Sequence, residues 1–262
     1  SYFLTDKMDE FYNVDLLGYQ NSLIELEIRS KKEGFYWTKR MAFLEPYQSL
    51  FDFQLVENHQ GRHRFGGKIK HQITGLKQDV HLTFNLDLRD LPLPVMWSPK
   101  ISQLPLLYSF NTPDFFQYEI ISDEHINIVS MGDCNDEMIT LKEFPQRQFS
   151  LKELSYEEKK VRTCAESDFH DDFNEEDEVL WKKLGGNTPL FFGGKVPYNQ
   201  GEVSCLNPKC KKEDSVDLFF TLVPFAIDED RNFWEDYDNE FIDICFYVCG
   251  SGQNIIVCNS CD

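Results

Sequence analysis

The sequence FIDICFYVCGSGQNIIVC, residues 241–258, consists of two apolar runs separated by Gly-Ser-Gly-Gln. Short apolar runs that are bounded by turn-forming residues are typical of buried β-strands, and the Gly-rich break between them favours a hairpin. In such a hairpin Cys245 would lie opposite Cys258, and Cys249 would lie opposite Asn254. Side chains alternate along a strand, so Cys245 and Cys249 would point to the same face.

Strand-like patterns recur through most of the chain. We expect strands within residues 21–30, 34–45, 49–58, 66–73, 80–88, 104–111, 115–122, 125–132, 188–194 and 217–227. Prolines at 92, 94, 99 and 105 indicate a connection over 87–105, because proline cannot donate to a central ladder. Residues 150–183 are acidic and predict helices. The sequence therefore predicts a β-dominated fold, between all-β and α+β.

Two glycine pairs suggest an internal duplication. Phe65-Gly66-Gly67 and Leu184-Gly185-Gly186 each precede an apolar strand, a linker and a second apolar strand. We predict a pseudo-duplicated antiparallel sheet unit, with a β-rich repeat and its lead-in at 1–150, an acidic helical connection at 151–183, and a β-rich repeat with cysteine knuckles at 184–262. The repeats could pack as one domain. No Lys-Ser/Thr follows the glycines, so we interpret them as positions of positive φ and not as phosphate loops.

Paired cysteines near the C-terminus predict a metal site. Cys205 and Cys210 form a C-x4-C pair, and Cys258 and Cys261 form a C-x2-C pair. Two separated pairs of this kind are typical of a tetrahedral structural zinc site, in which Asn-Pro at 207–208 would supply a tight turn. Two alternatives stay open: Cys245 or Cys249 could replace one ligand, or the cysteines could be buried as small apolar side chains.

Charge limits the classes of partner. The net charge of −19 disfavours nucleic acid and anionic membranes, and it favours a basic protein partner. The acidic stretch 166–178 could be a solvated linker or a docking surface. No apolar run approaches the roughly 20 residues that a membrane helix needs. The N-terminus has no secretory signal pattern, so we expect a cytoplasmic protein.

No catalytic constellation is evident. Four histidines, at 59, 63, 71 and 81, are interpreted as solvated turn and strand residues. The stretch DCNDE at 133–137 lacks the later glycine and glutamate of a calcium loop. We therefore favour a non-enzymatic binding protein, such as an immunity protein or an escort. The alternative is a hydrolase or transferase with a pocket between the two repeats.

Several of these motifs resemble a known family. FGG at 65–67, LGGNTP at 184–189, LTFNLDLRDLP at 82–92 and LFFTLVPF at 218–225 resemble the YwqG-like family and its eukaryotic relative, programmed cell death protein 2. The cysteines at 205, 210 and 249–261 occupy the regions where that relative has cysteine pairs. The resemblance implies a pseudo-duplicated β fold without established catalytic residues. It also implies an escort role, because the eukaryotic members look like escorts of a basic ribosomal protein.

Overall fold

The computed structural model describes a set of ranges that begins at residue 53. They are residues 53–91, 100–110, 115–132, 143–166, 173–186, 190–192, 203–210, 216–223, 242–249 and 253–261. The strands expected at 21–30 and 34–45, the lead-in before them and the DCNDE stretch lie outside these ranges.

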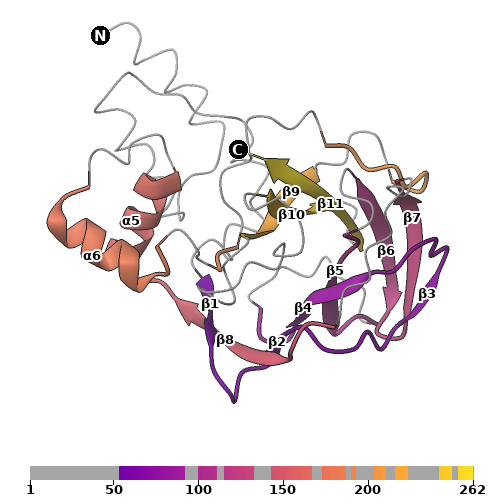
Figure 1. Cartoon of the computed structure of the whole chain (residues 1–262), viewed down its shortest axis with the longest axis horizontal. Helices are drawn as coiled ribbons and strands as arrows, with labels where there is room; N and C mark the ends of the chain where they lie inside the picture. Colours follow the sequence, from indigo (N-terminus) through magenta and orange to yellow (C-terminus); the bar gives the residue numbers. More distant parts are fainter. Residues whose placement is uncertain are drawn as a thin grey trace, which may run out of the picture.

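Strands dominate the described chain (Figure 1). In chain order the elements are β1 (Phe53–Glu57), β2 (His63–Phe65), β3 (Gln72–Thr74), β4 (His81–Asp87), β5 (Gln103–Tyr108), β6 (Phe116–Ser122), β7 (His125–Met131), β8 (Arg147–Glu153), α5 (Tyr156–Glu166), α6 (Glu175–Lys183), β9 (Val216–Leu222), β10 (Ile242–Cys249) and β11 (Asn254–Cys261). The predicted β-dominated fold is therefore confirmed.

These strands form two sheets. The five-stranded sheet has the order β1-β8-β2-β4-β5, and the six-stranded sheet has the order β3-β7-β6-β11-β10-β9. The short strand β3 pairs with β7 in parallel, whereas the other strand pairs are antiparallel. The expected hairpin of β10 and β11 is present, and Cys245 lies opposite Cys258 as predicted. Strand β11 also pairs with β6, so the six-stranded sheet joins strands that are far apart in sequence.

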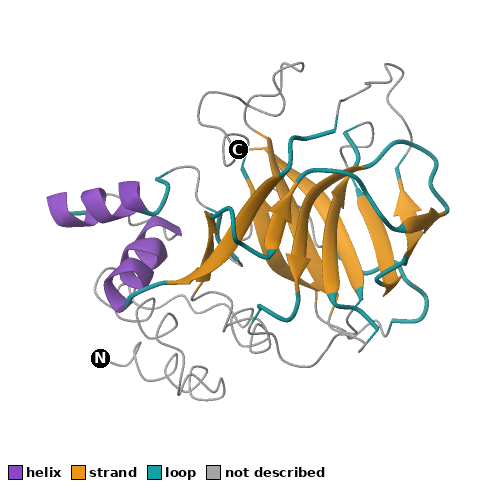
Figure 2. Ribbon diagram, turned by 90° about the horizontal axis from the view of Figure 1, so that it is seen from below, coloured by secondary structure: helices purple, strands orange, loops and turns teal. Residues whose placement is uncertain are grey.

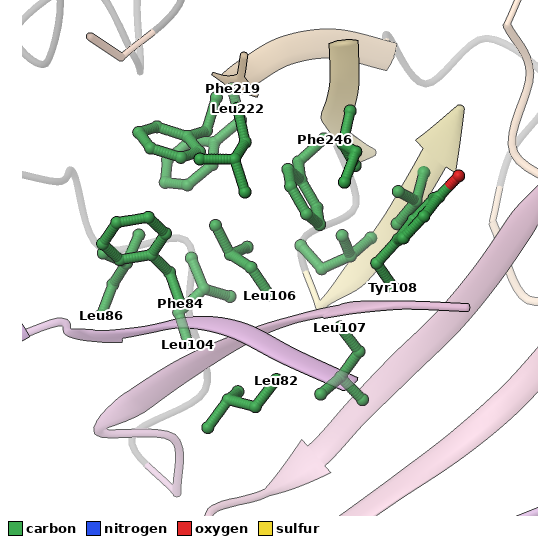
Figure 3. Close-up of a cluster of buried hydrophobic side chains, with 14 of the residues drawn as sticks. Leu82, Phe84, Leu86, Leu104, Leu106, Leu107, Tyr108, Phe219, Leu222 and Phe246 are labelled. Atoms are coloured by element: carbon green, nitrogen blue, oxygen red, sulfur yellow. The ribbon is translucent and has the colours of Figure 1, made fainter. Parts of the chain in front are cut away.

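The two sheets enclose one large apolar core (Figure 2). Figure 3 shows side chains of β4 and β5 directed toward those of β9 and β10, with Phe84 and Leu106 facing Phe219 and Phe246. Residues 190–192 connect the sheets at one side, because Phe191 bridges to Gln54 of β1 and the next residue bridges to Phe220 of β9. Apolar burial between the sheets is the main stabilising contribution to this fold.

Helices α5 and α6 lie together at one end of the sandwich (Figure 2). Arg162 of α5 is fully buried, donates to the carbonyl oxygen of Phe192 and stacks over the Phe191 ring at 4.4 Å. This residue fixes α5 to the segment that connects the sheets. Helix α6 begins at a capping box in which the Asn174 side chain accepts from the backbone N–H of Asp177.

Three local expectations need correction. The strand expected at 66–73 is interrupted, because Gly66 and Gly67 adopt positive φ angles of 67° and 81° in the turn after β2. Strand β8 continues to Glu153, so residues 150–153 are extended and not helical. Pro105 lies inside β5, where it is tolerated because β5 is an edge strand.

Candidate metal centre

One face of the six-stranded sheet points away from the main core and carries cysteines. We call it the outer face; on β9, β10 and β11 its buried apolar residues are Leu218, Cys245, Tyr247, Cys249, Ile256 and Cys258. The intervening residues of β10, such as Phe246, belong to the core between the sheets. Alternation along β10 thus directs Ile244, Phe246 and Val248 into the core, and directs the two cysteines and Tyr247 to the outer face.

Residues 203–210, which we call the cysteine loop, lie against this outer face. Cys205 and Cys210 pack against its buried cluster. The predicted Asn-Pro turn is confirmed, since the N–H of Cys210 donates to the carbonyl of Asn207 at 3.0 Å. The Asn207 side chain also accepts from the N–H of Lys209 at 3.0 Å, which is an Asx-turn. This turn brings the two ends of the C-x4-C pair back toward each other.

Three sulfur atoms meet where the loop contacts the end of β10. The Sγ atoms of Cys205, Cys210 and Cys249 lie within 4.8 Å of one another. Tetrahedral zinc with bonds of about 2.3 Å would place its sulfur ligands about 3.8 Å apart. A contraction of at most about 1 Å would therefore bring the three sulfurs to ligating distance. We call these residues the sulfur group; they lie close enough to bind a metal ion.

Two buried amides donate to the sulfur group. Nε2 of Gln117, on β6, donates to Sγ of Cys205 at 3.1 Å. Nδ2 of Asn254, on β11, donates to Sγ of Cys210 at 3.4 Å. Both amide residues are almost completely buried. Cys205 and Cys210 each therefore accept one hydrogen bond from the sheet, an arrangement suited to sulfurs that carry negative charge.

The environment of Cys205 disfavours its ionised form when no cation is present. Burial raises the pKa of the Cys205 thiol to about 12, and the adjacent sulfurs of Cys210 and Cys249 contribute to the rise. Thiolates must replace thiols before a metal can bind, so a cation would have to displace these protons. The chemistry of the group therefore matches a thiophilic divalent cation, whose positive charge would stabilise three neighbouring thiolates, one buried and two half-buried.

The predicted ligands are divided between two regions. Cys205 and Cys210 come together as expected, and their partner is Cys249, an alternative ligand that the sequence left open. Cys258 lies opposite Cys245, four positions along β10 from Cys249, and burial raises the pKa of its thiol to about 11. The backbone of Cys261 pairs with Ile242, at the other end of the hairpin. An extended strand rises about 3.3 Å per residue, so about 23 Å separates the Cys249 end of β10 from the Cys261 end.

The two amides do not belong to any motif that the sequence predicts to be functional, although the pattern of β6 carries a signal for them. Gln117 and Glu119 alternate with Phe116, Tyr118 and Ile120, so the polar pair shares the outer face. Glu119 forms an ion pair with Lys209 of the cysteine loop, in which Oε2 of Glu119 lies 3.0 Å from Nζ of Lys209. A strand with polar residues on one face, buried by a loop, indicates a polar interface and not solvent. Nothing in β6 itself identifies that loop.

His63 is a second departure from the sequence interpretation, because it is fully buried and not solvated. Its Nδ1 accepts from the backbone N–H of Asp87 at 3.2 Å, and its Nε2 lies 3.3 Å from Oδ2 of Asp90. Burial lowers the pKa of His63, and the two carboxylates partly oppose that shift. Both ring nitrogens therefore contact protein groups, and His63 links β2 to the Asp87–Asp90 turn.

Comparisons with known proteins do not assign a family. No family model matches the chain, and no curated protein and no solved structure matches it. The resemblance to the YwqG-like family thus stays a prediction. In the ranges that the structure describes, no helix combines the length and apolarity that crossing a membrane requires.

Proposed function

We propose that this protein is a non-enzymatic, zinc-stabilised acidic binding protein that captures a basic protein partner, as an immunity protein or an escort does. The sulfur group would hold the zinc, and the zinc would fix the cysteine loop to the outer face. A reducing compartment such as the cytoplasm would keep the thiols available for the metal.

A structural role for zinc is supported by the way in which the cysteine loop is held. Its buried contacts are hydrogen bonds to Gln117 and Asn254, an ion pair to Glu119 and the sulfur group. Leu206, the one leucine of the loop, is 53% exposed. Val203, Cys205 and Cys210 are only partly buried against the outer-face cluster, so the hydrophobic effect stabilises the loop modestly and a metal–thiolate bond network would add to its stability.

The observation that carries partner binding is helix α6, which contributes no buried residue to the protein. Its first turn contains Glu175, Glu176, Asp177 and Glu178. A helix of nine residues is too short to be stable by propensity alone. Here the capping box stabilises the N-terminus, and Lys182 and Lys183 complement the dipole at the C-terminus. The acidic side chains are thus presented in a fixed arrangement that a basic surface can contact.

A salt-dependent capture experiment tests this proposal. The protein is immobilised and exposed to native lysate at low salt, and captured proteins are identified and eluted with increasing salt. We expect basic proteins that elute as ionic strength rises, because screening weakens exposed charge pairs. Recovery of proteins that are not basic, or binding that resists salt, would contradict the proposal.

A pair of matched variants separates a specific surface from general charge. Glu175, Glu176 and Glu178 are changed together to Gln, which removes three charges from α6 and retains Asp177 for the capping box. The control changes three exposed acidic residues outside α6, Glu124, Glu143 and Glu153, to Gln. We expect the α6 variant to lose most of the capture and the control to retain it.

A further inference from the structure

The cysteine loop covers polar residues of the sheet, and two of them have no evident role in packing. Gln117 is fully buried and Asn254 is 3% exposed, although both lie among strands whose other buried residues are mainly apolar. Burying an amide is unfavourable unless its polar atoms are hydrogen-bonded. An apolar residue of similar size would fill either position without that requirement. The contacts that the amides make should therefore explain why amides are present.

The oxygen atom of each amide is fixed by the cysteine loop. Oε1 of Gln117 accepts from the backbone N–H of Leu206 at 2.8 Å. Oδ1 of Asn254 accepts from Nδ2 of Asn207 at 2.9 Å. Turning either amide over would place two N–H groups face to face, so the hydrogen bonds determine the orientation.

The fixed oxygens direct the amide nitrogens at the sulfur group. Nε2 of Gln117 reaches Cys205 at 3.1 Å, and Nδ2 of Asn254 reaches Cys210 at 3.4 Å. The two amides also contact each other, with Nε2 of Gln117 3.4 Å from Oδ1 of Asn254. Two strands, β6 and β11, thus supply one N–H donor to each of two sulfurs through a connected network.

We propose that Gln117 and Asn254 are positioning residues of the metal centre, which orient Cys205 and Cys210 and donate hydrogen bonds to their sulfurs when these ligate the metal. This inference rests on the proposed metal site. Hydrogen bonds to a charged acceptor are stronger than those to a neutral one, so the amides would favour the metal-bound form of the sulfurs. Groups that hydrogen-bond to metal ligands typically change metal affinity by about 10–100-fold.

Isosteric substitutions provide a sharp test. Gln117→Glu and Asn254→Asp retain an oxygen for Leu206 and Asn207, and they replace the donor that faces the sulfur by an acceptor. Gln117→Leu and Asn254→Leu remove the donor without adding charge, for the case in which an acidic variant does not fold. The control is Asn85→Asp, because Asn85 is a half-buried amide of the five-stranded sheet that donates to Gln103 and not to sulfur.

Two properties of the full-length protein are measured. The affinity for zinc is determined by competition with a chromophoric chelator, and cobalt(II) is substituted to record its sulfur-to-metal charge-transfer band. Near-ultraviolet circular dichroism verifies that the aromatic core of each variant is folded. We expect the zinc affinity to fall by about 10–100-fold in the variants at 117 and 254. We also expect the cobalt band to move to lower energy, because a sulfur without its N–H donor releases an electron more easily.

The outcomes separate this inference from the proposal on which it rests. A wild-type protein that binds neither zinc nor cobalt overturns both. Wild-type binding with an unchanged affinity and an unchanged cobalt band in the folded variants overturns the positioning role alone. A loss of affinity as large in Asn85→Asp as in Asn254→Asp also overturns it, because a non-specific perturbation of the protein would then explain the effect.

Discussion

The two faces of the six-stranded sheet are stabilised in different ways. The face toward the five-stranded sheet is apolar and rich in aromatic residues, as the packing of Phe246 against Phe220 at 6.4 Å illustrates. On the outer face, the cysteine loop is held by the sulfur group, two amides and an ion pair. The same strand, β10, contributes alternate residues to both faces.

This difference indicates which part of the protein depends on a bound metal for its stability. Apolar burial is non-directional and does not depend on ions, so the core between the sheets should form with or without zinc. Metal–thiolate bonds in the sulfur group form only when a cation is present. Metal removal should therefore release the cysteine loop and leave the sandwich folded. Four predictions test this separation.

The largest expected effect is in the inner core. Phe84 is fully buried and contacts the rings of Phe65, Phe149 and Phe220 at 5.3–5.4 Å. Phe84→Ala should lower the free energy of unfolding by about 3–5 kcal/mol, because it removes apolar contacts and leaves a cavity. Urea unfolding measures the loss, which should be equal with zinc and with a chelator. A loss that depends on the metal would show that the two faces are coupled. The control, Leu76→Ala at an exposed position, should change stability by less than about 0.5 kcal/mol.

The next effect is loss of the metal itself. Cys249→Ser should abolish the binding of one equivalent of zinc and reduce stability by about 3 kcal/mol when zinc is in hundred-fold excess over its dissociation constant. Elemental analysis and thermal unfolding measure the two changes. Cys164→Ser on α5 should retain the zinc, because Cys164 is outside the sulfur group. Cys258→Ser should also retain it; loss of zinc in that variant would instead support the ligand set predicted from the sequence.

A smaller effect concerns the protonation of His63, which lies on β2 of the five-stranded sheet. Burial lowers the pKa of His63 from its usual 6.5, and the positive charge of Arg62 lowers it slightly further. The carboxylates of Asp90 and Asp87 raise the pKa and oppose part of this shift. The unfolded chain therefore binds the proton more tightly. The contribution of neutral His63 to the free energy of unfolding is complete above pH 6.5. It decreases as the pH falls below 6.5 toward the pKa of His63 in the folded protein.

Stability should fall by about 1 kcal/mol for each pH unit just below 6.5. His63→Gln should flatten this dependence when urea unfolding is measured between pH 5 and pH 8, and His59→Gln, at an exposed position, should not. Equal slopes in the wild type and in His63→Gln would contradict the assignment. Zinc should leave the slope unchanged if the two regions are independent.

The smallest effect concerns the ion pair of the cysteine loop. Lys209 is mostly exposed, whereas Glu119 is largely buried, so Lys209→Met would leave the carboxylate without this partner. We expect a loss of about 0.5–1 kcal/mol, because an exposed lysine contributes little beyond satisfying Glu119. Hydrogen exchange should increase at Leu206 and Cys210 and stay constant in β4. Lys70→Met, at an exposed position, should change neither region.

Much of the fold could be predicted from local patterns, and the errors have local causes. Alternation located β4, β6, β7 and the β10–β11 hairpin, including the pairing of Cys245 with Cys258. Strand β8 was assigned partly to a helix because its sequence, RQFSLKE, leads directly into an acidic helical stretch. The burial of His63 depends on the Asp87–Asp90 turn that follows β4, so the local pattern around His63 wrongly predicts a solvated side chain. The Asn-Pro turn at 207–208 was predicted correctly because its geometry is set by adjacent residues.

Local patterns in the chain were sufficient for the β-dominated class, the acidic charge, the turn of the cysteine loop and the shared face of Cys245 and Cys249. Packing of distant segments brings Cys249, and not Cys258, to Cys205 and Cys210, and it directs Gln117 and Asn254 at their sulfurs. The physical reason is that alternation fixes which side of a strand a residue occupies, whereas packing of the whole core selects the neighbouring strands and loops. Contacts between β6, the cysteine loop and β11 span 44 to 137 positions of the chain, and no local pattern encodes them.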